Sequence, residues 1–82
     1  MYKTSTRGVC CRMITFDIVD GKITDVCFHG GCHGNTQGIA ALAEGRTPEE
    51  VIAVLEGIRC GQKPTSCPDQ LAQALKAAIA KN

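Results

Sequence analysis

The sequence predicts a small α+β domain in which an antiparallel β-hairpin or small sheet is followed by three helices. Two patterns carry this prediction. Apolar and polar residues alternate over residues 13–28, and residues 36–80 show helical apolar spacing divided by helix start and stop signals. With 82 residues the chain has room for one domain, which we place at residues 1–82.

The hairpin is expected over residues 13–28. Its first strand carries apolar side chains on one face, namely Ile14, Phe16 and Ile18. Asp20-Gly21 follows, and this pair favours a type I′ turn because both central residues of that turn have φ > 0. The returning strand should also place alternate residues on one face, namely Thr24, Val26 and Phe28.

The first two helices are expected over residues 36–44 and from residue 48 to about residue 56. The first is mostly Ala, Leu and Ile, and Gly45 suits the C′ position that ends a helix. The second begins with Thr47-Pro48-Glu49-Glu50, a capping box with proline at the first helical position. Gly57 would end this second helix.

The third helix is expected to begin at Ser66-Cys67-Pro68-Asp69, because Ser-x-x-Asp with an internal proline repeats the start signal of the second. An apolar stripe at helical spacing then continues through Leu71, Leu75 and Ile79. The cysteine within the start signal therefore lies at the N-terminus of a helix.

Composition argues against several classes of function. Nine basic and eight acidic residues give a net charge of +1, so there is no electrostatic footprint for nucleic acid or an anionic membrane. No apolar run approaches the roughly 20 residues of a membrane span. The first residues contain no apolar signal region, so we expect a cytoplasmic protein. No complete active site is recognisable, which leaves open whether the chain is an enzyme.

Six cysteines stand out in a chain that has two Phe, one Tyr and no Trp. A domain of this size buries only about 60–65% of its unfolded surface, and such domains commonly add disulfides, a metal or a partner chain. Two of the thiols, Cys32 and Cys67, lie at expected helix N-termini, where free amide groups and the helix dipole favour a thiolate. A thiolate is both the metal-binding and the nucleophilic form of cysteine.

Simpler interpretations exist for several of these residues. Cys27, in the middle of a strand, is expected to be a small buried hydrophobe, and Cys11 is either a spare thiol or a ligand. Without a secretory signal, disulfides are the less expected use of the cysteines, and the lack of C-x-x-C makes spacing alone weak support for zinc. Gly30-Gly31-x-x-Gly34 lacks the lysine of a phosphate loop. His29 and His33 are either ligands or solvated loop histidines.

The segment Thr65–Asp69, together with several others along the chain, resembles the TSCPD domain family. Thr65-Ser66-Cys67-Pro68-Asp69 is the motif that names the family, and the other matching segments extend over nearly the whole chain: Cys10, Phe28-x-Gly30-Gly31-Cys32-x-Gly34-Asn35, Gly57-Ile58-x-Cys60-Gly61 and Asp69-Gln70-Leu71-Ala72. Related domains are appended to cobalamin-dependent ribonucleotide reductases. The resemblance therefore implies a structural or interaction role linked to ribonucleotide reduction and DNA biosynthesis, with such a reductase or another protein as partner. The chain is too short to be the reductase itself.

The order of a cysteine, a hairpin, a glycine-cysteine segment, a helix and a helix that starts with cysteine is more distantly similar to iron–sulfur cluster scaffolds of the NifU N-terminal type. That similarity implies that three cysteines converge at one end of the fold, namely Cys10, Cys32 and Cys67. The chain departs from the scaffolds in having Ser66 in place of a histidine and Arg12 in place of an aspartate, and it adds Cys60. A fourth thiolate in place of a histidine favours a closed tetrathiolate site.

The resulting prediction is one Zn²⁺ ion held by four thiolates, from Cys10, Cys32, Cys60 and Cys67. Structural zinc can contribute on the order of 10 kcal/mol to the apparent free energy of folding, which would dominate so small a core. An iron–sulfur cluster on the same thiols is the alternative cofactor and would make the chain a cluster scaffold or carrier. A second alternative is a thiol redox carrier that delivers electrons to a reductase, using Cys10-Cys11, Cys32 and Cys67.

Overall fold

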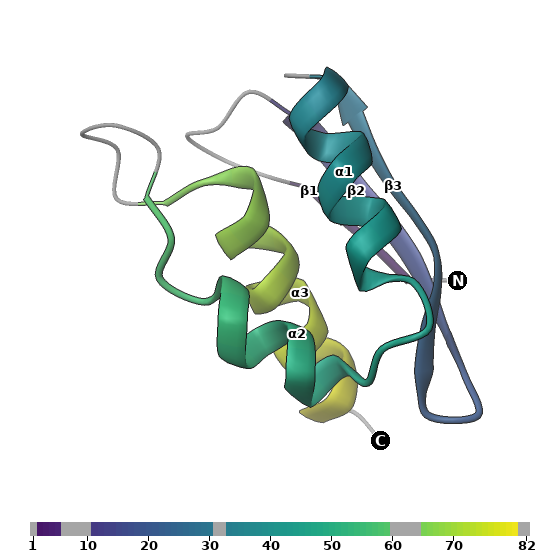
Figure 1. The fold of residues 1–82 in the computed structure, drawn as a ribbon. Helices are drawn as coiled ribbons and strands as arrows, with labels where there is room; N and C mark the ends of the chain where they lie inside the picture. Colours follow the sequence, from purple (N-terminus) through teal and green to yellow (C-terminus); the bar gives the residue numbers. More distant parts are fainter. Residues whose placement is uncertain (1, 6–10, 31–32, 60–64, 81–82) are drawn as a thin grey trace.

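The computed structural model describes residues 2–5, 11–30, 33–59 and 65–80. Over these residues the chain is α+β, as predicted (Figure 1). An antiparallel sheet in the order β1-β2-β3 comes first, formed by β1 (Tyr2–Ser5), β2 (Cys11–Val19) and β3 (Lys22–Gly30). Three helices follow and lie on one side of the sheet: α1 (His33–Ala43), α2 (Pro48–Leu55) and α3 (Cys67–Ala80).

The predicted hairpin joins β2 to β3. Asp20 and Gly21 form its turn with φ values of 54° and 76°, which explains the Asp-Gly pair at this point. The predicted inward face of β2 is confirmed, since Ile14 and Phe16 are fully buried and Ile18 packs against the same cluster.

A β-bulge interrupts the pairing in β3. Thr15 pairs with Cys27 and Asp17 with Thr24, so β3 has one more residue than β2 between these two pairs. Asp25 lies in this interval with a φ of 56°, in the left-handed region that asparagine and aspartate tolerate better than most residues.

The bulge changes which residues of β3 face the helices. Ile23 is fully buried in the core, and Val26 and Phe28 also pack against it. Thr24 follows Ile23 and therefore points to the opposite face. The prediction that Thr24 shares a face with Val26 and Phe28 is wrong, because an alternation with period two does not hold across an inserted residue.

β1 extends the hairpin to a three-stranded sheet. It pairs with β2 from Tyr2–Phe16 to Ser5–Met13. The rings of Tyr2 and Phe16 are stacked, with centroids 5.2 Å apart and an interplanar angle of 15°. A strand of four residues is too short to give a periodic signal, and its formation depends on the partner strand.

The helix boundaries lie close to the predicted ones. α1 begins three residues earlier than expected, and Gly45 follows it with a φ of 78°. The capping box of α2 forms: the Thr47 hydroxyl accepts the Glu50 N–H at 3.2 Å, and the Glu50 carboxylate accepts the Thr47 N–H at 3.1 Å. Gly57, with a φ of 86°, follows the end of α2.

Backbone hydrogen bonds join the turn after α1 to the sheet near the tip of the hairpin. The Gly45 N–H donates to the Ile23 carbonyl, and the Ile23 N–H donates to the Arg46 carbonyl, both at 2.8 Å. The core lies between the sheet and the helices and consists of Ile14, Phe16, Ile23, Ala43, Val51, Leu71, Leu75 and Ala78.

Candidate functional site

The predicted zinc ligands divide into two groups. Cys10, Cys32 and Cys60 lie outside the described residues, whereas Cys67 is the first residue of α3. Its side chain is a free thiol, half-buried and packed against the core. That the four sulfur atoms converge stays a prediction. The described residues next to each cysteine in the sequence show what surrounds the predicted site.

The neighbours of Cys10 and Cys32 form a cross-strand pair. Cys11 directly follows Cys10 in the sequence, and it is paired with Gly30, two residues before Cys32. The Arg12 side chain lies beside Gly30, since a Cβ atom at this glycine would be 3.5 Å from Arg12 Nε. A cationic side chain therefore lies at the open end of the hairpin.

Ser66 is the N-cap of α3, which confirms the predicted start of this helix. Its carbonyl accepts the Gln70 N–H at 2.8 Å, and its hydroxyl accepts the Asp69 N–H at 3.2 Å. The same hydroxyl donates to the Ile58 carbonyl at 2.7 Å. Ser66 thus joins the start of α3 to the segment that leaves α2, and its hydroxyl is fully engaged in doing so.

Asp69 directs its carboxylate to this same segment. Oδ1 accepts the Gly57 N–H at 2.7 Å, and Oδ2 accepts the Thr65 hydroxyl at 2.5 Å. The Gln73 amide lies 3.5 Å from Oδ1. We refer to Gly57, Thr65, Ser66 and Asp69 as the Asp69 cluster.

Asp69 is nearly buried, with 7% of its surface exposed, yet it is stabilised as a carboxylate. The hydrogen bond from the Thr65 hydroxyl, followed by that from the Gly57 amide, holds its pKa below the usual value near 3.8. Burial acts in the opposite direction and is outweighed. The charged group therefore serves as a double acceptor at neutral pH.

The described elements that flank the predicted ligands start or end on the same side of the molecule. In Figure 1 β2 begins, β3 ends and α1 begins at the upper end, and α3 begins in the upper half of the same view, further to the left. The hydrogen bonds of the Asp69 cluster hold the segment after α2 at the start of α3. Among the described residues, the neighbours of Cys60 and Cys67 are joined by hydrogen bonds, and those of Cys10 and Cys32 by strand pairing.

The surroundings of Cys27, His29 and His33 differ from those predicted from the sequence. Cys27 is exposed, so the prediction of a buried hydrophobe is wrong, because the helices cover only one face of the sheet. His29 is a half-buried residue of β3 rather than a loop residue, and its Nε2 lies 3.1 Å from the Thr15 hydroxyl. His33 is the first residue of α1.

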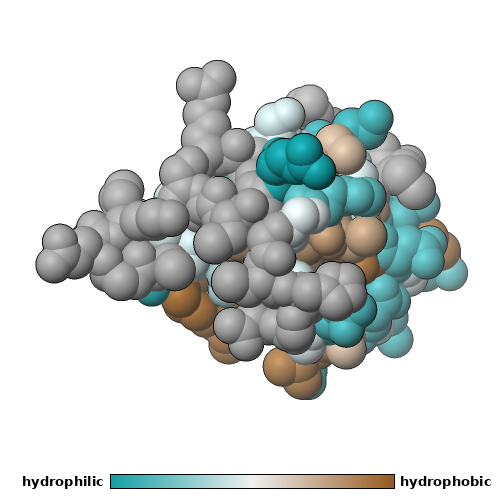
Figure 2. All heavy atoms as spheres, turned by 90° about the horizontal axis from the view of Figure 1, so that it is seen from above, coloured by the Kyte–Doolittle hydropathy of each residue, from teal (hydrophilic) through white to brown (hydrophobic). Residues whose placement is uncertain are grey.

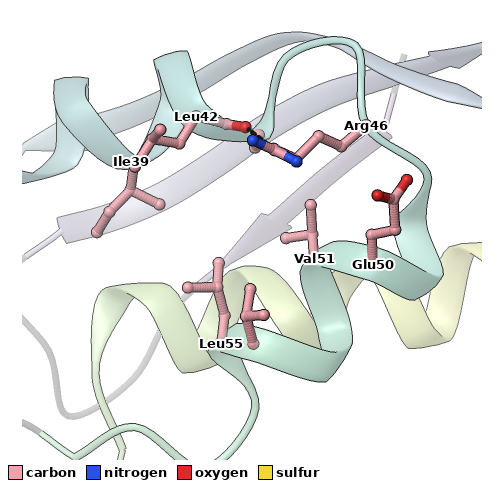
Figure 3. A pocket seen from close by; sticks show the side chains of 8 residues that line it. Ile39, Leu42, Arg46, Glu50, Val51 and Leu55 are labelled. Atoms are coloured by element: carbon pink, nitrogen blue, oxygen red, sulfur yellow. Dashed lines mark hydrogen bonds between the residues drawn. The ribbon is translucent and has the colours of Figure 1, made fainter.

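A groove of about 470 Å³ lies between α1 and α2 (Figure 3). Its walls are mainly apolar, and Leu42 and Val54 are each 68% exposed there. Arg46 and Glu50 are the charged residues of its lining, and both bind locally: Arg46 Nε donates to the Leu42 carbonyl at 2.7 Å. The backbone hydrogen bond from Thr47 holds the pKa of Glu50 below its usual value. Among the described residues that line the groove, no set of polar side chains is arranged as a catalytic site would be.

Hydrophobic side chains of the described residues reach the surface in several separate places (Figure 2). Among the residues that the structure describes, no group of three or more His, Cys, Asp or Glu side chains could hold a metal ion. Nor does any helix in the described ranges have the length and apolar character to cross a membrane.

These features define a small α+β domain whose last helix starts with a cysteine. The start of this helix is hydrogen-bonded to the segment that follows α2. The family model of the TSCPD domain matches residues 2–79. The chain therefore belongs to the TSCPD domain family, as the motif Thr65–Asp69 implied. Comparison with curated proteins and with solved structures gave no match, so the similarity to iron–sulfur scaffolds stays a prediction.

Proposed function

We propose that this chain binds one Zn²⁺ ion through four thiolates and acts as a metal-stabilised structural or interaction module. The ligands would be Cys10, Cys32, Cys60 and Cys67. The observation that supports this proposal is that the described neighbours of the ligands are joined in pairs: Cys11 pairs with Gly30, and the start of α3 is hydrogen-bonded to the segment Gly57–Ile58.

The donor chemistry fits zinc. Four thiolates match the closed tetrahedral sites that hold structural Zn²⁺, and thiolate ligands select zinc over magnesium or calcium. Ser66, which replaces the histidine of the similar scaffolds, uses its hydroxyl to cap α3 and to bind Ile58. It is thereby committed to the fold, and Cys60 becomes the natural source of a fourth ligand.

The charge near the site also fits a tetrathiolate. Zn²⁺ with four thiolates carries a net charge of −2, and the Arg12 side chain beside Gly30 would offset part of it. The N-terminus of α3 adds the positive end of a helix dipole at Cys67.

The partner in this proposal is a ribonucleotide reductase, because related domains occur at the C-terminus of the cobalamin-dependent enzymes. The role would be contact and support rather than catalysis. A pull-down with a purified reductase of this class, with and without bound zinc, tests the partner independently of metal binding.

Metal analysis of protein purified without added metal tests the zinc site. We expect about one equivalent of zinc, and Co²⁺ substitution should give the intense charge-transfer and ligand-field bands of tetrahedral thiolate coordination. Cys60→Ser should reduce the zinc content, whereas Cys27→Ser, which alters an exposed thiol on the sheet, is the matched control. Less than about half an equivalent in the wild type would overturn the proposal.

The same protein separates zinc binding from the two other candidates. With zinc bound, a thiol reagent should react in the native state with Cys27 and Cys11 and with no other cysteine. A redox carrier would instead show a dithiol that is reversibly oxidised near cytosolic potential. An iron–sulfur carrier would become coloured after anaerobic reconstitution with iron and sulfide.

A further inference from the structure

We propose that Asp69 is a positioning residue for the proposed metal site, because its carboxylate holds together the two described ends of the connection between α2 and α3. This inference rests on the proposed zinc site and assigns to the acidic residue of the TSCPD motif a role other than ligation. The loop runs from Gly57 to Thr65 and contains Cys60, and Cys67 follows it by two residues.

The first observation is that one carboxylate binds both ends of this loop. Oδ1 accepts the Gly57 N–H at one end, at 2.7 Å, and Oδ2 accepts the Thr65 hydroxyl at the other, at 2.5 Å. Gly57 and Thr65 are eight positions apart in sequence, yet they bind the two oxygens of one side chain.

The second observation is that Ser66 adds a parallel connection one residue further along. Its hydroxyl donates to the Ile58 carbonyl at 2.7 Å while accepting the N–H of Asp69. The backbone is thus bound at two successive residues, Gly57 and Ile58, just two residues before Cys60. Ser66 and Asp69 are both buried, so water competes little for these bonds.

The third observation is that these contacts exceed what a helix start requires. At α2 the N3 acid, Glu50, returns to the N-cap residue Thr47 and completes a local capping box. At α3 the N3 acid has the same position in the helix but binds the distant Gly57. Stability of the helix end alone does not call for that contact, and holding the loop does.

The physical consequence concerns the entropy of metal binding. Bringing two ligands of one chain, such as Cys60 and Cys67, to one metal ion costs conformational entropy of the residues between them. If the ends of the segment are already held, less freedom is lost and the affinity for the metal is higher. Residues that support the ligands from outside the ligand set commonly change metal affinity by about 10–100-fold.

The test compares Zn²⁺ affinity among variants of the full chain, by competition with a chromophoric chelator. Asp69→Asn and Thr65→Val should each weaken zinc binding by about 10–100-fold, the range for supporting residues at metal sites. Thr65→Ser keeps the hydroxyl and should stay within about threefold of the wild type. Val51→Ala is the control, because it removes core packing without touching the loop. Circular dichroism of each zinc-loaded variant establishes that it is folded.

Co²⁺ spectra add a readout that a general loss of stability would not change. We expect the ligand-field bands of Co²⁺ to shift or broaden in Asp69→Asn and Thr65→Val and to be unaltered in Val51→Ala. If Asp69→Asn fails to fold, the pair Thr65→Val and Thr65→Ser decides the matter. Affinities in Asp69→Asn and Thr65→Val equal to that of Val51→Ala would overturn the inference while leaving the zinc site intact. A wild type that binds no metal would overturn both.

Discussion

The starts of α2 and α3 look alike in sequence and differ in the structure. Both consist of Ser or Thr, a proline within the first two helical residues, and an acid three positions after the cap. At α2 the acid completes an exposed, local capping box. At α3 it is buried and binds a residue twelve positions earlier in the chain. The same sequence signature can therefore only cap a helix, as at α2, or also join two distant segments, as at α3. The acid is exposed in the first case and buried in the second.

Removal of the proposed zinc ion should have the largest effect on stability, and the loss should be greater at the start of α3 than at the start of α2. Structural zinc can supply on the order of 10 kcal/mol of apparent folding free energy, so a chelator should lower the unfolding temperature sharply. Amide hydrogen exchange should increase most at Gly57 and Gln70, next to the proposed site, and less at Val51 in α2. Equal increases at both helix starts would contradict the idea that the metal supports the α3 end specifically.

Replacing the two acids should give the next largest difference. Asp69→Ala leaves the Gly57 N–H and the Thr65 hydroxyl without their acceptor in a buried place, which should cost about 3 kcal/mol. Glu50→Ala removes an exposed capping contact, which solvent can replace, and should cost clearly less. Urea denaturation of the zinc-loaded protein at neutral pH measures both. Equal losses would show that the Asp69 cluster is no more than an ordinary cap.

Removing the cap hydroxyl should also lower the free energy of unfolding more at α3 than at α2, by a smaller margin than removing the acids. Thr47→Ala removes one capping hydrogen bond and should lower the free energy of unfolding by about 1 kcal/mol. Ser66→Ala removes a cap and also the bond to the Ile58 carbonyl, so we expect about 2 kcal/mol. Denaturation curves recorded side by side test this order, and a larger loss in Thr47→Ala would reverse it.

The smallest expected effect is the titration of Glu50. Its folded-state pKa is lowered by the Thr47 hydrogen bonds, so its contribution to stability is present above its usual pKa and is lost as the pH falls through the lowered value. NMR of the carboxyl carbon, followed from about pH 7 downward, should show titration starting at a lower pH in the wild type than in Thr47→Ala. Identical curves would mean that the capping box does not hold the carboxylate in solution.

Local signals in the sequence predicted most of the fold. Asp20-Gly21 and the capping box at Thr47 act within a few residues, so the turn and the helix start could be located without tertiary information. The bulge at Asp25 and the strand β1 could not, because both depend on pairing with β2. The exposure of Cys27 was missed for a related reason, since strand alternation does not say which face the helices cover.

The four ligands of the candidate site stay a prediction from the sequence, and the contacts that support the start of α3 were not predicted. The motif Thr65–Asp69 marked Cys67 and suggested a helix start, and both features follow from residue types at short spacing. The contact between Asp69 and Gly57 joins residues in different elements, and no pattern around either residue signals it. Gly57 was predicted to end α2, which is correct. The prediction did not include the hydrogen bond that its N–H donates to Asp69.

The backbone bonds between Ile23 and the turn after α1 have a consequence for the order of folding. Because main-chain groups make them, they close the hairpin end of the domain without help from cysteine or metal. We therefore expect the sheet, α1 and α2 to assemble first as a template. If the proposed zinc ion is bound at the far end, the supply of zinc would set how much of the newly made chain matures.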